Sequence, residues 1–287
     1  MIEFSNLIRF CADRYQKISF CQHCNMKNCL RGETNNCYCC LHELHQYNCK
    51  EHYCCEKITY NYVLKHFHRY TSECIKALLF IKKYFDKNLP LNIVSIGCGP
   101  SSELYAAAYA YPEFQIKYFG YDMNSTWQPI QNFNITNLSN IIINYSNANF
   151  WDCYNEQTYF ADILIMNYLL SDLVKSEGAD DFVTRITQAI NSGHFSFIII
   201  NDVALFYNSG TGYSLMERIC RGINDNNNFR FEYIRRHFSI PNEYQITYGK
   251  KEDDTLIIQT TEEESMPYDP FEKCGSIQLI IHCKRVN

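Results

Sequence analysis

The stretch LNIVSIGCGPSSELYAAAYAYPEFQIKYFGYDMN, residues 91–124, predicts an α/β fold for most of the chain. An apolar segment at 92–96 runs directly into a turn with two glycines at 97–100. A helix-like segment follows, and a second apolar segment at 116–120 ends just before Asp122. This succession is typical of strand, turn, helix and strand at the nucleotide-binding edge of a parallel sheet.

The turn after the first strand limits which nucleotide can bind. Gly97 and Gly99 allow a sharp turn and let a ligand approach the backbone, and Ser101 or Ser102 is expected to cap the following helix. Ser102 also stands where the dinucleotide pattern G-x-G-x-x-G requires a third glycine. Glu103, in the first turn of the helix, is a poor neighbour for a diphosphate. The sequence therefore favours a cationic nucleoside without phosphates, with its ribose hydroxyls on the carboxylate that ends the second strand.

Hydrophobic periodicity extends the prediction to the rest of the chain. Apolar positions at three- and four-residue steps predict an amphipathic helix over 60–85. Beyond it, strand-like and helix-like segments alternate, which predicts a mostly parallel sheet covered on both faces, with an antiparallel C-terminal hairpin. Residues 250–273 are expected to form an exposed acidic loop. The predicted strands are 92–96, 116–120, 141–145, 162–166, 195–201, 231–238, 255–260 and 277–284, and the predicted helices after the first are 102–110, 182–191 and 213–223.

Residues 94–100, VSIGCGP, and 121–124, YDMN, resemble the first motif and the second-strand end of the class I S-adenosylmethionine-dependent methyltransferases. The resemblance implies a Rossmann-like seven-stranded sheet and S-adenosylmethionine as cofactor. It implies that the two glycines pass under the methionine, that the acid binds ribose, that the turn after the third strand contacts adenine, and that the end of the fourth strand lies near the transferred methyl. The residues that it assigns to the cofactor are Gly97, Cys98, Gly99, Pro100, Glu103, Asp122, Met123, Asn149, Phe150 and Asn167.

Candidate catalytic residues follow the fourth strand. Asn167 and Tyr168 are expected to hydrogen-bond or stack with an acceptor and Asp172 to take a proton, although all three also suit an ordinary loop and helix start. The two prolines of the amino-DNA enzymes of this family are absent, so that acceptor class is not supported. Asp202, after the fifth strand, is a weaker substrate candidate. His194 is expected to be structural.

Three kinds of acceptor stay open: a nucleic acid, with RNA slightly favoured, a protein, or a small molecule. A second hypothesis is a zinc-containing scaffold whose methyltransferase-like domain does not react. On the predicted leading helix, His66 and Tyr70 either cover the cofactor or belong to the core. The cationic residues between Lys57 and Lys87 form either a phosphate-binding face or a solvated helix flank.

The N-terminal segment holds most of the 16 cysteines, ten of them from Cys11 to Cys55. Without a recognisable export signal, thiolates that hold metal are favoured over disulfides. Two C-x2-C pairs separated by twelve residues predict one tetrahedral zinc, with ligands left for a second ion. An iron–sulfur cluster and unligated buried thiols are the alternatives. The candidate ligands are Cys21, Cys24, Cys29, Cys37, Cys39, Cys40, His42, His45, Cys49, Cys54 and Cys55.

Composition divides the chain into a Cys/His-rich zinc module at 1–58, a covering helix and linker at 59–90, and an α/β methyltransferase domain at 91–287. The net charge of −5 argues against a generally basic nucleic-acid binder. No apolar run approaches the ~20 residues that span a bilayer, and the N-terminus does not resemble a signal peptide. The sequence therefore predicts a cytoplasmic protein without a membrane partner, and it leaves the oligomeric state open.

Overall fold

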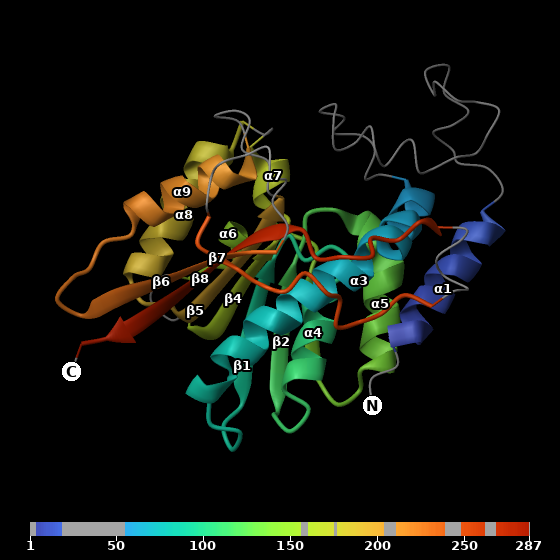
Figure 1. Ribbon diagram of the computed structural model, residues 1–287, viewed down its shortest axis with the longest axis horizontal. Helices are drawn as coiled ribbons and strands as arrows, with labels where there is room; N and C mark the ends of the chain where they lie inside the picture. Colours follow the sequence, from blue (N-terminus) through green and yellow to red (C-terminus); the bar gives the residue numbers. More distant parts are fainter. Residues whose placement is uncertain are drawn as a thin grey trace.

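The computed structural model describes residues 4–18, 55–155, 160–174, 177–203, 211–238, 248–261 and 268–286. Its centre is an eight-stranded sheet in the order β3-β2-β1-β4-β5-β8-β6-β7 (Figure 1). The strands are β1 Leu91–Ile96, β2 Ile116–Tyr121, β3 Ile142–Ser146, β4 Ala161–Asn167, β5 Phe195–Val203, β6 Phe229–His237, β7 Lys250–Lys251 and β8 Ser276–Arg285. The helices are α1 Phe4–Lys17, α3 Glu56–Ile81, η2 Lys82–Tyr84, α4 Ser102–Ala110, η3 Ser125–Trp127, α5 Gln128–Asn137, α6 Phe150–Cys153, α7 Leu170–Leu173, α8 Ala179–Asn191 and α9 Gly212–Gly222.

The sheet has a parallel part and a reversed part. Strands β3, β2, β1, β4 and β5 pair in parallel, whereas β8 runs antiparallel to both of its neighbours, β5 and β6. This arrangement confirms the Rossmann-like α/β fold. The seven strands that the family resemblance implies are one too few, because the two residues of β7 pair with the end of β6 as an eighth strand.

Both faces of the sheet are buried, as the apolar strands predict. Successive side chains of a strand point to opposite faces, so Ile93 of β1 packs under α3, α4 and α1, while Val94 packs under α8 and α9. Figure 1 shows these two helix layers on either side of the strands. The described part of the chain contains no helix long and apolar enough to cross a membrane.

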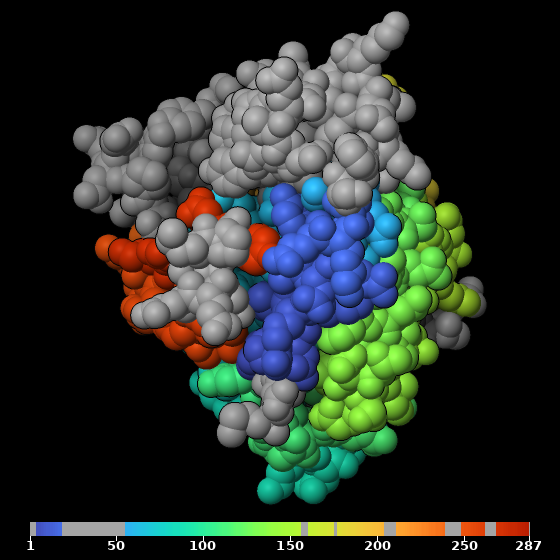
Figure 2. All heavy atoms as spheres, turned by 90° about the vertical axis from the view of Figure 1, so that its right-hand side faces the viewer, coloured from blue at the N-terminus to red at the C-terminus, as the bar shows by residue number. Residues whose placement is uncertain are grey.

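Helix α3 lies in the middle of one layer and is buried over most of its surface. It begins before the predicted residue 60 and ends at Ile81, where a short 3-10 turn takes over. Helix α1 packs beside it and contributes Leu7 and Cys11 to the same core. Phe10 of α1 stacks on Phe133 of α5 at 4.4 Å between ring centroids. Figure 2 shows α1, in blue, on the surface between the green residues around α5 and the orange-red C-terminal part.

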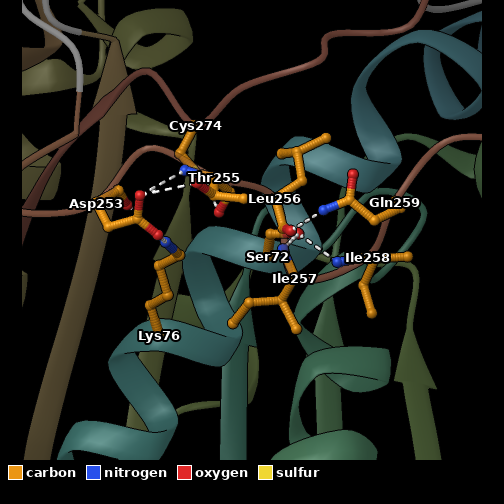
Figure 3. A network of polar contacts seen from close by, with 9 residues as sticks. All are labelled: Ser72, Lys76, Asp253, Thr255, Leu256, Ile257, Ile258, Gln259 and Cys274. Carbon is orange, nitrogen blue, oxygen red and sulfur yellow. Dashed lines mark hydrogen bonds and ion pairs between the residues drawn. The ribbon is translucent and has the colours of Figure 1, made fainter.

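The connection from β7 to β8 crosses α3 as a strap, and we use this name for residues 252–261 and 268–275 (Figure 3). The Ser72 hydroxyl on α3 accepts hydrogen bonds from the backbone amides of Ile257 and Ile258, both at 3.0 Å. Leu256 and Ile258 are buried. The prediction of a strand at 255–260 is wrong, because in this stretch only Thr255 forms a bridge, to Lys273.

The strap also pairs with the cationic side chains of α3. Lys65 lies 3.2 Å from Asp269 and Lys76 lies 3.3 Å from Asp253. The Arg69 guanidinium lies 3.6 Å from the centroid of the Phe271 ring. In the described part of residues 250–273 the strap packs on α3 through buried apolar residues while its acids, such as Asp253 and Asp269, stay exposed. These contacts also reduce the positive charge that α3 presents for phosphates. The acidic run at 262–264, on which the prediction of an exposed loop rests, lies outside the described residues.

Candidate functional site

The glycine turn after β1 has the backbone that the sequence predicts. Gly97 and Gly99 have φ angles of 67° and 46°, in the left-handed region that favours glycine. A Cβ on Gly97 would lie 2.6 Å from Cδ1 of Leu169, so a side chain there would also force Leu169 to move. Ser101 stands at the cap of α4 but makes no capping hydrogen bond through its side chain. The predicted position of the cap is therefore confirmed, but the predicted hydrogen bond to its hydroxyl is not made, because Ser101 adopts a left-handed conformation.

Asp122 joins the ends of β1 and β2. One oxygen of its carboxylate accepts a hydrogen bond from the amide of Gly99, and the other accepts one from the amide of Asn124, each at 2.8 Å. Burial raises the pKa of Asp122 to about 6, although both amide donors favour the charged form. The carboxyl is therefore mostly ionised at neutral pH.

A cavity of about 520 Å³ opens at the carboxyl ends of β1, β2 and β4. Polar groups at this edge of a parallel sheet are brought together by the fold itself. The cavity is lined by every residue that the sequence assigned to the cofactor or to catalysis, namely Gly97, Cys98, Gly99, Pro100, Glu103, Asp122, Met123, Asn149, Phe150, Asn167, Tyr168 and Asp172. Their individual roles stay predictions.

The described side chains that line the cavity include acids but no bases. Among the described residues that line it there are four acids, Glu103, Asp122, Asp172 and Asp181, and no Lys, Arg or His. Asp181 also pairs with Arg185 at 3.0 Å. Such a lining repels the phosphates of a dinucleotide and suits a ligand that carries positive charge.

Glu103 lies deeper than its place in the first turn of α4 indicates. It is 1% exposed, and its carboxylate accepts hydrogen bonds from the hydroxyls of Tyr118 at 2.5 Å and Ser102 at 3.3 Å. Burial raises its pKa. Its carboxylate therefore borders the base of the cavity and is already engaged by the protein.

The predicted adenine contacts come from the turn after β3. The Asn149 side chain accepts a hydrogen bond from the amide of Trp151 at 3.2 Å and so caps α6. Phe150 is buried, whereas Met123, from the turn after β2, is 74% exposed at the edge of the cavity. An apolar pocket floor with an exposed thioether at its rim suits a flat aromatic base.

The turn after β4 is held from two sides. The Asn167 amide donates to the Ser102 hydroxyl at 2.9 Å and accepts from Asn201 at 3.0 Å. Tyr168 has a φ of 58°, and its ring stacks on Tyr70 with 3.7 Å between centroids. Burial raises the pKa of the Tyr168 phenol, so it stays neutral and cannot serve as a base. Asp172, on α7, is exposed and lines the cavity.

Two other sequence candidates lie outside the lining. Asp202 is fully buried and accepts hydrogen bonds from the amides of Ser171 and Val203, at 3.0 and 2.7 Å. It therefore anchors the start of α7, and the prediction that it contacts substrate has no support in this geometry. His194 precedes β5 at the opposite edge of the sheet and hydrogen-bonds with Tyr154, in line with the structural role expected of it.

Sequence reasoning missed much of the aromatic lining, which includes Tyr62, Trp127, Trp151 and Phe182. Tyr62 and Tyr70 lie eight residues apart on α3, and both face the cavity. His66 lies between them in the sequence and contacts both rings, with centroid distances of 4.6 and 5.0 Å, but does not line the cavity. The helical spacing was a usable signal, although it is equally typical of core residues.

The predicted zinc ligands from Cys21 to Cys54 lie outside the described residues. Cys55 is described, and it is buried directly before α3. Within the described ranges, no group of three or more His, Cys, Asp or Glu side chains is arranged to hold a metal ion. The zinc module therefore stays a prediction.

No family model matches the chain, and no curated protein matches it. Among solved structures, the chain is similar to the plantazolicin methyltransferase BpumL in complex with SAH, with 12% identity and a TM-score of 0.42 over 96% of this chain and 99% of that chain. It is also similar to the magnesium protoporphyrin IX methyltransferase from Synechocystis PCC 6803 with bound SAM, with 14% identity and a TM-score of 0.41 over 75% and 79% of the two chains. A third is the precorrin-6y C5,15-methyltransferase from Geobacter metallireducens GS-15, with 14% identity and a TM-score of 0.39 over 74% and 89%. The assignment of function rests on the cavity.

Proposed function

We propose that this chain is an S-adenosylmethionine-dependent methyltransferase whose cavity binds the methyl donor. The observation that carries the proposal is the position of Asp122 beside the glycine turn, in a cavity whose described lining has four acids and no cationic residue. A dinucleotide would bring phosphates into this negative field, whereas S-adenosylmethionine brings a sulfonium and no phosphate. The cavity of about 520 Å³ lies within the usual range for sites of this kind.

Different groups of lining residues would bind the ribose, the methionine and the adenine of S-adenosylmethionine. The Asp122 carboxylate would accept the ribose hydroxyls, and the open backbone of Gly97 and Gly99 would lie under the methionine. The turn with Asn149 and Phe150 would hold the adenine. The methyl group would then face the turn that follows β4, where Asn167 is fixed by two hydrogen bonds.

When bound, the donor supplies an activated methyl group, and the protein has mainly to align it with a nucleophile. The fixed Asn167 amide and the stacked Tyr70 and Tyr168 rings form a rigid wall for that alignment. Asp172, exposed on α7, can pass a proton to solvent. The cavity therefore has the groups that a direct displacement requires.

Isothermal calorimetry with S-adenosylmethionine tests the donor site. Wild-type protein should bind, and Asp122→Ala should weaken binding by tenfold or more because the ribose loses its acceptor. Asp13→Ala removes an exposed carboxylate from α1 and is the matched control. Absence of binding by the wild type, or equal affinities of the wild type and Asp122→Ala, would contradict the assignment.

A scaffold that binds the nucleoside without transferring its methyl group is the second candidate. It is favoured by the Tyr168 hydroxyl, which donates its hydrogen to Glu73 at 2.8 Å and therefore cannot donate it to a substrate. Transfer of labelled methyl groups into a cell extract separates the two candidates. Binding of the donor without any label in the extract would support the scaffold.

We also propose, from the cysteine spacing, that the N-terminal segment holds one or two zinc ions. Elemental analysis of the purified full chain should find at least about one zinc per molecule, and a chelator should lower the thermal stability. Less than one zinc per chain, or iron with a brown colour, would contradict the proposal.

A further inference from the structure

We propose that the methyl acceptor is a basic amine, which enters the cavity as an ammonium ion between an aromatic wall and Asp172. This inference rests on the proposed function and adds the class of acceptor. It is carried by two independent features of the described residues, namely the arrangement of the aromatic rings and the distribution of charge.

The aromatic wall consists of Trp127, Tyr62, Tyr70 and Tyr168, which all line the cavity. Adjacent rings along it have centroids 5.4, 5.9 and 3.7 Å apart, so the wall is continuous from η3 to the turn after β4. Faces of aromatic rings attract ammonium ions, and enclosed aromatic sites are a common means of binding them. The wall ends at Tyr168, next to the expected position of the methyl group.

The charge around this wall is negative. Asp172, Glu103 and Asp122 line the same cavity as Tyr62. Burial and these acids raise the pKa of the Tyr62 phenol, while a hydrogen bond with Tyr70 opposes the shift. The described lining offers no cationic side chain to neutralise them. A phosphate or carboxylate on the acceptor would be repelled, whereas an ammonium ion would be attracted. The cationic residues Lys65 and Lys76 of α3 are paired with acids of the strap and do not line the cavity.

The transfer step balances with the groups present. The ammonium gives a proton to the Asp172 carboxylate and becomes a neutral amine. The nitrogen lone pair then forms a bond to the methyl carbon, while the carbon–sulfur bond breaks and its electrons stay on sulfur as a thioether. The positive charge moves from sulfur to nitrogen and remains beside the carboxylates throughout. Asp172 finally releases its proton to water, which its exposure permits.

The test follows methyl-labelled S-adenosylmethionine into a cell extract that is separated, after reaction with the full chain, into a small-molecule filtrate and a macromolecular fraction. We expect label that survives both mild base and acid hydrolysis and is recovered as an N-methylated amine. Protease-sensitive label in the macromolecular fraction would identify a protein amine, and label in the filtrate would identify a small amine; both support the inference. Label that is released by nuclease would indicate a nucleic-acid acceptor, and label that is lost in mild base would indicate a methyl ester. Either result would overturn the inference of an amine acceptor.

Variants at position 172 test the role of the carboxylate. Asp172→Asn should lower transfer at least tenfold and Asp172→Glu should restore part of it. Asp172→Glu keeps the charge and should bind S-adenosylmethionine within about threefold of the wild type, whereas any loss of donor affinity in Asp172→Asn should be smaller than its loss of transfer. Asp180→Asn is the matched control, since Asp180 is exposed, pairs with Arg218 at 2.7 Å and does not line the cavity. If Asp172→Asn transferred methyl groups as fast as the wild type, Asp172 would not be the group that accepts the proton. Donor binding without label in any fraction would overturn the acceptor inference alone, whereas loss of donor binding would first overturn the proposed function.

Discussion

The carboxylate of Glu73, on α3, accepts a hydrogen bond of 2.8 Å from the hydroxyl of Tyr168, which directly follows β4. The other oxygen of Glu73 accepts the amides of Gly275 and Ser276, at 2.7 and 3.1 Å, where the strap enters β8. A single buried side chain therefore ties the leading helix, the cavity wall and the last strand together. Burial raises the pKa of Glu73, while its donor partners oppose that shift.

Replacing Glu73 by Ala should lower the free energy of unfolding by about 3 kcal/mol or more, because three donors would lose their acceptor inside the protein. Glu73→Gln keeps an oxygen for the two backbone amides and should cost clearly less. Urea denaturation measures both values. If the two variants were equally stable, the hydrogen bonds of Glu73 would not be what stabilises this junction.

The donor affinity should depend on pH through Asp122. Its pKa of about 6 means that the carboxyl is largely protonated at pH 5 and ionised at pH 7. Because the ionised form accepts the ribose hydroxyls and attracts the cation, affinity should rise about tenfold from pH 5 to 7. The donor amino group, with a pKa of roughly 8, keeps its charge over this range. Calorimetry at several pH values measures the effect, and Asp122→Asn should abolish it.

Gly97→Ala should weaken binding of S-adenosylmethionine by tenfold or more. The new Cβ would lie 2.6 Å from Leu169 and would force an alanine into the left-handed region, so the turn must change shape. Asp13→Ala, on the exposed side of α1 and outside the cavity lining, serves again as the control. Unchanged affinity in Gly97→Ala would mean that the turn does not lie under the donor.

The Ser72 hydroxyl should stabilise the strap more than the ion pair between Lys76 and Asp253 does. Ser72→Ala would leave the amides of Ile257 and Ile258 without their acceptor and should cost about 1–3 kcal/mol of stability. Lys76→Met keeps the aliphatic stem and removes the ammonium, which pairs with the exposed Asp253 carboxylate and also donates to the Asp253 carbonyl. Because this group lies at the surface, its loss should cost less than about 1 kcal/mol. Denaturant titration of both variants decides the order, and a larger loss in Lys76→Met would contradict it.

Local sequence signals predicted the parts of the site that depend on the backbone. The glycine turn and the acid at the end of β2 were predicted because turn geometry and strand ends follow from residue type and spacing. Tyr62 was missed because aromatic residues at helical spacing are equally typical of a core, and Trp127 was missed because it lies in a short 3-10 turn that has no periodic pattern. The strap was predicted as an exposed loop because its charges are visible in the sequence, whereas their partners, Lys65 and Lys76, lie 204 and 177 residues away.

The position of β8 sets the order in which the molecule can assemble. The last strand of the chain, Ser276–Arg285, lies between β5 and β6 and not at an edge of the sheet. Among the described strands, β6 pairs only with β7 and β8, which both follow it in the sequence, so during synthesis it gains its antiparallel partner only after β8 has been made. The wall of the cavity likewise gains the Glu73 contacts of Gly275 and Ser276 only at that moment. A truncation of a dozen C-terminal residues would therefore remove the middle of the reversed part of the sheet and not merely its end.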